Sequence, residues 1–153
     1  SQEPDIDFQP LLEERFVAAC RRDHPLARER SVAWSDLRRY DFISVSQSSG
    51  NRVLLDQALA SLRERPQSIY EVQHVTTTLG LVEAGLGVAA VPSMAMPDED
   101  HPLLVSVPLS NPVVKRTVGV IRRKGRSLSP AAQQLHAFLM EMERMSGRPR
   151  AGD

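Results

Sequence analysis

Cysteine is almost absent from this sequence, which contains one, Cys20, among its 153 residues. A single cysteine excludes an intrachain disulfide and any zinc site built from several cysteines. Because Cys20 falls in a short apolar run, we expect a buried, inert thiol, whereas a contact or redox role would require that this run face a cleft. The four histidines are scattered without an H-x-x-x-H pair, so we expect neither a metal site nor a cofactor.

A surplus of charge is also missing, because 19 basic and 19 acidic side chains give a net charge of zero. A surface that neutralises phosphates needs an excess of Lys and Arg, so the chain itself is not expected to bind DNA. No apolar run approaches the roughly 18 residues of a transmembrane helix, and the polar, acidic N-terminus is unlike a signal peptide. We therefore expect no membrane association and a cytoplasmic setting, unless a signal is removed before residue 1.

Recognisable catalytic motifs are missing as well. The sequence contains no G-x-S-x-G, P-loop or G-x-G-x-x-G motif. Residues 85–87, G-L-G, lie between a helix and the following strand, which is the wrong order for a dinucleotide-binding turn. No two carboxylates have a spacing that indicates acid–base chemistry. We expect no catalytic residues, and the chain is not expected to be an enzyme.

What the sequence does contain is an alternation of short apolar runs with segments of helical spacing. We expect strands at 16–20, 41–45, 68–72, 86–91, 103–107 and 113–121, and helices at 35–40, 51–64, 76–85 and 129–142. The length fits one domain or two small lobes, and the alternation predicts an α/β fold with a mostly parallel sheet flanked by helices. In such sheets, ligands bind beyond the carboxyl ends of the strands, beside helix N-termini.

Two loops fit this placement. Residues 46–51, S-Q-S-S-G-N, offer hydroxyls, an amide and backbone N–H groups at a helix start, which suits a carboxylate or another small anion. A solvated loop that caps a helix explains the same residues. Residues 76–78, three threonines, can also cap a helix or point a hydroxyl at a ligand. His74, just before them, either faces a cleft or is an ordinary histidine at a strand end.

The terminal helix carries a stripe of large apolar side chains. Core packing is the favoured interpretation, and an interaction surface is the alternative. The residues concerned are Leu135, Phe138, Met140, Met142 and Met145.

Several segments together resemble the LysR-type transcriptional regulators. Residues 82–92, V-E-A-G-L-G-V-A-A-V-P, are similar to a stretch of that family's effector-binding domain in which a helix ends in A-G-x-G and a strand ends in proline. Residues 16–27, F-V-A-A-C-R-R-D-H-P-L-A, resemble the family's strand followed by H-P-L-A, and residues 34–37, W-S-D-L, resemble its next helix. Residues 118–124 and 129–142 resemble the family's last strand and last helix, so the likeness extends from about residue 8 to 145.

The resemblance implies a periplasmic-binding-protein-like fold, in which two α/β lobes are joined by two crossover strands and a small effector binds in the cleft. Residues 1–21 would cross into lobe two, and residues 22–108 would form it. Residues 109–145 would supply the return strand and the C-terminal helix of lobe one, and residues 146–153 a flexible tail. Carried over by position, the cleft residues would be Ser46, Gln47, Ser48, Ser49, His74, Val75, Thr76, Pro92 and Met94.

By this resemblance we expect the effector-sensing domain of a DNA-binding transcription factor, with a small molecule as its partner. The hydroxyls at the two helix starts favour a carboxylate. A solute-binding protein of a transporter, with the same fold, is the alternative. DNA would be bound only through a helix-turn-helix module, which this sequence lacks. The first part of lobe one is missing too, so the chain resembles an N-terminally truncated domain. Residues 113–121 and the terminal helix would then pair with another copy, giving a homo-oligomer, or leave apolar surface exposed.

Overall fold

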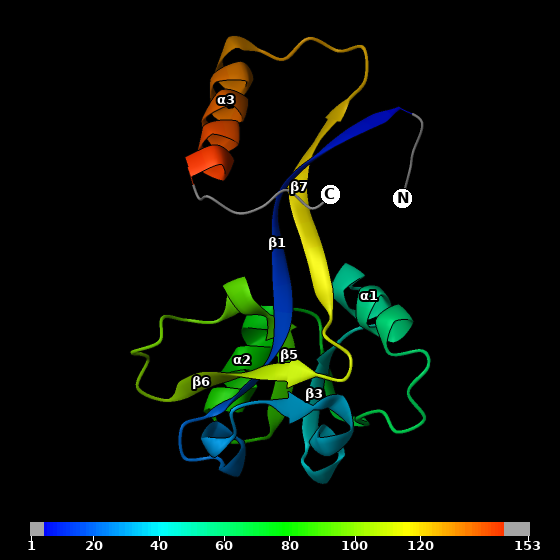
Figure 1. The fold of residues 1–153 in the computed structure, drawn as a ribbon, viewed down its shortest axis with the longest axis vertical. Coiled ribbons are helices and arrows are strands. Elements are labelled where there is room, and N and C mark those ends of the chain that lie inside the picture. Colours follow the sequence, from blue (N-terminus) through cyan, green and yellow to red (C-terminus); the bar gives the residue numbers. More distant parts are fainter. Residues whose placement is uncertain (1–4, 146–153) are drawn as a thin grey trace. The chain divides into compact units, whose positions relative to one another are not determined.

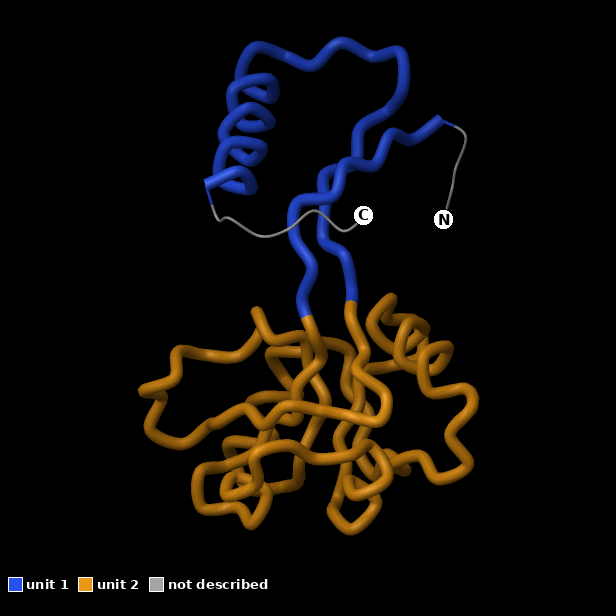
Figure 2. Tube along the Cα trace, viewed as in Figure 1, with its two compact units in different colours: residues 1–14, 116–153 blue, residues 15–115 orange. Residues whose placement is uncertain are grey.

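The computed structural model describes residues 5–145 and divides into two compact units (Figure 2). The larger unit comprises residues 15–115, and the smaller unit comprises residues 1–14 and 116–153. The larger unit includes more residues at both ends than the lobe predicted at 22–108. The predicted boundaries stay predictions. The tail predicted at 146–153 lies outside the described residues.

Figure 1 labels the α-helices and most of the strands. In chain order, the elements are β1 (Ile6–Arg21), η1 (Pro25–Arg28), β2 (Val32–Ala33), η2 (Trp34–Arg39), β3 (Phe42–Val45), α1 (Gly50–Ala58), β4 (Ser68–Val72), α2 (Val75–Glu83), β5 (Val88–Pro92), η3 (Ser93–Ala95), β6 (Leu104–Ser110), β7 (Lys115–Arg123) and α3 (Pro130–Met145). No helix within residues 5–145 is both long and apolar enough to cross a membrane.

The sheet of the larger unit has the strand order β2-β6-β1-β5-β3-β4. β3 is parallel to β4 and β5, and β2 is parallel to β6, whereas β1 is antiparallel to both of its neighbours, β5 and β6. In this order β1 alone therefore runs against the other strands. The sheet is mixed but mostly parallel, which confirms the α/β, periplasmic-binding-protein-like fold expected from the sequence.

Alternation along the central strands divides the core between the two faces of the sheet. Phe42 of β3 packs with α1 and the two 3-10 helices η1 and η2, in a cluster that includes Trp34 and Leu55. Its neighbour Ile43 packs on the other face with Val82 of α2. Successive side chains of a strand point to opposite faces, and helices cover both faces here, so β3 is buried along its whole length.

β1 is longer than the strand expected at 16–20, because its first half pairs with β7 in the smaller unit. The Lys124 N–H donates to the Asp5 carbonyl at 2.9 Å, and Arg116 contacts Glu14 at 2.5 Å. The residue number on β7 therefore falls as the residue number on β1 rises, so the two strands are antiparallel. Local patterns did not indicate this extension, since residues 6–14 alternate little and contain Pro10.

Helix ends differ from the sequence-based expectation. α1 stops at Ala58, not at residue 64, and Leu59 and Leu62 reach the core through turns instead, with the Leu62 N–H bonded to the Leu59 carbonyl at 3.0 Å. α2 begins at Val75 with His74 as its N-cap, which places the expected threonine cap inside the helix. The helix expected at 35–40 is a 3-10 helix.

α3 carries no buried residue, so core packing of its apolar stripe was the wrong interpretation for this chain. Leu135 and Phe138 are each 60% exposed, and Met142 is 54% exposed. In the single chain this stripe is exposed, which fits both alternatives expected for the smaller unit, pairing with another copy and an exposed apolar surface. Ser129 caps α3, because its hydroxyl accepts the Ala132 N–H at 3.3 Å.

The A-G-L-G turn between α2 and β5 has a steric explanation. Gly85 has φ 82°, which lets α2 end in a left-handed residue, and Gly87 has φ 155°. A Cβ at Gly87 would collide with the Asp41 carbonyl oxygen, which accepts the Val88 N–H at 2.9 Å. That hydrogen bond starts the pairing of β5 with β3, so Gly87 is required where these two segments of the backbone approach each other.

We predict that Gly87→Ala lowers the free energy of unfolding by about 1–3 kcal/mol, because it forces a backbone region that side chains rarely occupy and a backbone collision. Gly80→Ala is the matched control, since a Cβ there meets nothing within 4 Å inside α2, and it should stabilise by about 0.5–1 kcal/mol. Urea unfolding measures both values. Equal effects of the two substitutions would contradict this account of the turn.

Candidate functional site

The nine residues proposed from the sequence lie at one edge of the larger unit's sheet. β5, β3 and β4 are adjacent and parallel, so their carboxyl ends meet at the same edge. Residues 46–49 follow β3, residues 73–76 follow β4, and η3 follows β5. Segments that are separated along the chain are thereby brought to the edge where open α/β sheets bind ligands.

The loop at residues 46–49 is held by its backbone. The Ser46 N–H donates to the Val72 carbonyl of β4 at 2.8 Å, and the Ser49 N–H donates to the Ser46 carbonyl at 2.9 Å. The hydroxyls of Ser46 and Ser48 lie 2.9 Å apart in a mutual hydrogen bond. Gln47 and Ser48 are exposed, whereas Ser46 and Ser49 are half-buried. The loop is thus a tight turn that presents an amide and hydroxyls to solvent.

Two helix N-termini point toward this edge. Ser49 is the N-cap of α1 and His74 is the N-cap of α2, and neither side chain makes a capping hydrogen bond. In each helix the first intrahelical bond comes four residues later, from the N–H of Val53 and of Thr78. The partial positive charge of both helix dipoles is therefore directed to the edge, which favours an anion there.

The remaining proposed residues differ in accessibility. His74 and Thr76 are exposed, and Val75 is half-buried against the apolar cluster on the α2 face of the sheet. Pro92 is buried beside its partner Phe16 on β1, so it shapes the exit from β5 instead of facing solvent. Met94 in η3 is 63% exposed.

Thr78, by contrast, turns inward, and the sequence did not distinguish it from its neighbours. It is 1% exposed, and its hydroxyl donates to the His74 carbonyl at 3.3 Å. Of the three threonines, this one serves the helix itself. Thr76, one residue into α2, keeps its side chain at the surface.

Arg52 is a residue at this edge that sequence reasoning missed. It lies in the first turn of α1, and its guanidinium contacts the Ser44 hydroxyl at 3.1 Å and the Val45 carbonyl at 3.3 Å. Its side chain is only 22% exposed. Asp56 follows at i,i+4 spacing, which was the one signal in the sequence, but it is equally typical of an ordinary surface ion pair.

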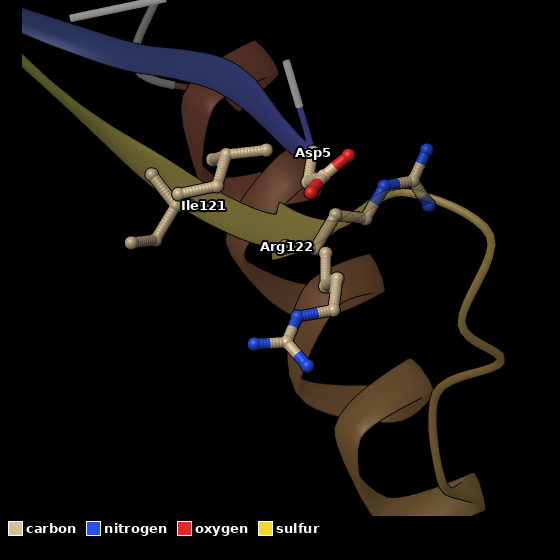
Figure 3. A pocket seen from close by; sticks show the side chains of 5 residues that line it. Asp5, Ile121 and Arg122 are labelled. Carbon is tan, nitrogen blue, oxygen red and sulfur yellow. The ribbon is translucent and has the colours of Figure 1, made fainter. Parts of the chain in front are cut away.

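Two shallow depressions lie elsewhere and contain none of the proposed residues. One, of about 530 Å³, is in the smaller unit, where Figure 3 shows Asp5, Ile121 and Arg122 around it. The other, of about 540 Å³, lies at the opposite edge of the larger unit's sheet, where its lining includes Arg21 and His24. Arg21 is already engaged, because it pairs with Asp23 at 2.9 Å and donates to the Glu83 carbonyl at 2.7 Å.

Cys20 is fully buried in β1 and carries a free thiol. Burial raises the pKa of this thiol to about 11, because the charged thiolate is disfavoured away from water. The protonated thiol is a poor nucleophile and a poor metal ligand. Within residues 5–145, no three His, Cys, Asp or Glu side chains are grouped so that they could hold a metal ion.

Comparisons with known proteins point to a single family. The family model described as the LysR substrate binding domain matches residues 1–144. The regulator YbhD of Escherichia coli K12, described as an uncharacterized HTH-type transcriptional regulator, is 50% identical over 90% of this chain and 43% of its own length. YfeR of Shigella flexneri, described in the same words, is 35% identical over 97% of this chain and 48% of its own length. The chain therefore spans less than half the length of these relatives.

A solved structure points to the same family. The effector-binding domain of QuiR in complex with shikimate is 26% identical, with a TM-score of 0.79, and the match covers 95% of this chain and 68% of that one. The relatives named above are transcriptional regulators, not solute-binding proteins of transporters. Members of this regulator family are not enzymes, in agreement with the missing catalytic motifs.

His24, in the second depression, is a titratable side chain that lies partly buried. Its Nδ1 accepts the Leu26 N–H at 3.1 Å, and its ring packs on Tyr40 with centroids 4.8 Å apart. Burial lowers the pKa of His24 below its ordinary value of 6.5, an effect that Asp23 partly offsets. The unfolded chain therefore binds the proton more readily, and stability is lost as the pH falls through 6.5 toward the native pKa.

We predict that the unfolding free energy of the native sequence falls more steeply between pH 7 and pH 5 than that of His24→Asn. This range is chosen because the histidine of the unfolded chain titrates near pH 6.5. Asparagine keeps an acceptor at this helix start but does not titrate. Urea unfolding at several pH values in this range gives the unfolding free energy of each protein. In the difference between the two proteins, the contributions of all other titrating groups cancel. Parallel curves for the two proteins would show that His24 is not responsible.

Proposed function

Because the chain belongs to the LysR substrate-binding domain family, we propose that it is the effector-sensing domain of a DNA-binding transcription regulator. The observation that carries the proposal is the meeting of three strand ends and two helix N-termini at one sheet edge. DNA contact belongs to a helix-turn-helix module outside this chain, in keeping with the net charge of zero. We place the regulator in the cytoplasm, where DNA is accessible.

The proposed effector is a small carboxylate. Two uncapped helix N-termini supply partial positive charge, and the exposed Ser48 and Thr76 supply hydroxyl donors. Met94 adds an exposed apolar contact at the end of β5. QuiR, whose effector-binding domain has been solved with shikimate, is similar in sequence and fold, which favours an acid of this size.

Sensing follows from a difference in affinity between conformational states. A ligand shifts a regulator only if it binds one arrangement of the protein more tightly than another. A carboxylate that bridges the loop at 46–49 and the start of α2 favours the arrangement in which both are presented together. That preference is the coupling free energy which a DNA-binding module can read.

We predict that the chain binds shikimate or benzoate, and that Ser48→Ala and Thr76→Val each weaken binding about tenfold, since a hydrogen bond to a charged group is lost. Ser61→Ala, in the exposed segment after α1, is the matched control and should bind as the native chain does. Titration calorimetry gives the affinities, with the uncharged amides of both acids as reference ligands. Binding of the amides as tightly as the acids, or of neither acid, would overturn the carboxylate proposal.

We also propose that the chain self-associates through the apolar face of α3. Leu135, Phe138 and Met142 expose a contiguous stripe, and monomeric proteins seldom leave such a patch open to water. The net charge of zero leaves no long-range repulsion between copies.

Phe138→Glu should shift the chain toward the monomer in analytical ultracentrifugation, because it places a charge in the stripe that association would bury. Ala137→Glu adds the same charge beside that stripe, at a position one residue away on the helix, and should leave the association intact. A native chain that is monomeric at concentrations of tens of micromolar, or equal behaviour of both variants, would refute self-association through this face.

A further inference from the structure

Arg52 connects the first turn of α1 to the ends of two strands. One Nη atom contacts the Ser44 hydroxyl at 3.1 Å and the Val45 carbonyl at 3.3 Å, both at the carboxyl end of β3. The same nitrogen lies 3.8 Å from a carboxylate oxygen of Glu71 on β4. Arg52 therefore reaches both neighbouring strands from a single position on the helix.

The partners of Arg52 are themselves held in place. The Ser44 hydroxyl also accepts a hydrogen bond from the Ser68 hydroxyl of β4 at 2.6 Å, and Ser44 is 9% exposed. Within α1, the Nε of Arg52 donates to both carboxylate oxygens of Asp56 at 3.0 Å. The guanidinium plane is thus fixed from two sides, which the flexible ammonium of a lysine could not reproduce.

The loop at residues 46–49 lies between these anchored points. It begins after Val45, whose carbonyl Arg52 holds, and it leads into the turn that carries Arg52. The charge of Arg52 is offset by Asp56 and Glu71, so its guanidinium is not available as a primary anion ligand. What it controls is the position of the backbone that precedes it.

We infer that Arg52 is a positioning residue, which fixes the loop at 46–49 and the first turn of α1 so that their N–H and hydroxyl groups are preorganised for a ligand. The ligand part of this inference rests on the proposed function, whereas the ordering of the loop does not. Preorganisation matters because a loop ordered in advance spares the ligand the entropy of ordering it.

Native-state hydrogen exchange tests the ordering. In Arg52→Lys, the amides of Ser46, Ser49 and Val53 should exchange about tenfold faster, because a charge-assisted hydrogen-bond network is lost. Amides of α2, such as Thr78 and Ala84, should keep their rates, which separates local loosening from a loss of global stability. Arg38→Lys, at the surface pair with Glu64, is the matched control.

Unchanged exchange in the loop, or equal acceleration throughout the larger unit, would overturn the inference. If Arg52→Lys does not fold, Asp56→Ala supplies the second variant, because it removes the Nε partner while Arg52 keeps its contacts to β3. The same local acceleration, of smaller size, is expected there. Its absence would count against Arg52 equally.

Calorimetry with shikimate and benzoate tests the ligand part. Arg52→Lys should bind about tenfold more weakly than Arg38→Lys at unchanged binding stoichiometry, as expected when a preformed site must first be ordered. Equal affinities would refute the positioning role in binding. If the native chain binds neither acid, the proposed function fails, and the exchange experiment still decides whether Arg52 orders the loop.

Discussion

The insertion of β1 between β5 and β6 is the constraint on which the larger unit depends. β1 is antiparallel to both neighbours and joins the parallel set β5-β3-β4 to the pair β6-β2 in one sheet. Ala18, Ala19 and Cys20 are completely buried in it, and such small side chains let elements on both faces approach the strand closely. Without β1, β6 and β2 would be an isolated pair of strands, which is at best marginally stable in water.

The candidate site is a consequence of this sheet. Since β5 is held by β1 on one side and by β3 on the other, its last residue, Pro92, has a fixed position opposite Phe16. The register between β3 and β5 is set at the other end, where Gly87 allows the chain to pass close to Asp41. Contacts far from the ligand edge therefore determine which side chains reach it.

Local patterns predicted the central strands and the existence of most helices, because burial on both faces leaves a continuous apolar run in the sequence. Features that depend on distant partners were not predictable in this way. β2 is two residues long and exists because β6 lies beside it, and the first half of β1 is a strand because β7 pairs with it. Arg52 was overlooked for the same reason, since its partner Glu71 becomes a neighbour only when β4 pairs with β3.

The candidate site presents hydroxyls and helix N-termini, and not a lysine, to the anion that we propose as its ligand. A lysine would add a mobile charge with a large conformational entropy to lose. Backbone N–H groups at a helix start are already fixed, and the bond from Ser46 to Val72 holds this loop before any ligand arrives. Fixed dipoles favour an anion without raising the net charge of the domain. In the proposed function, such a domain would bind small acids while another module recognises phosphate, since neither task then competes for the same positive surface.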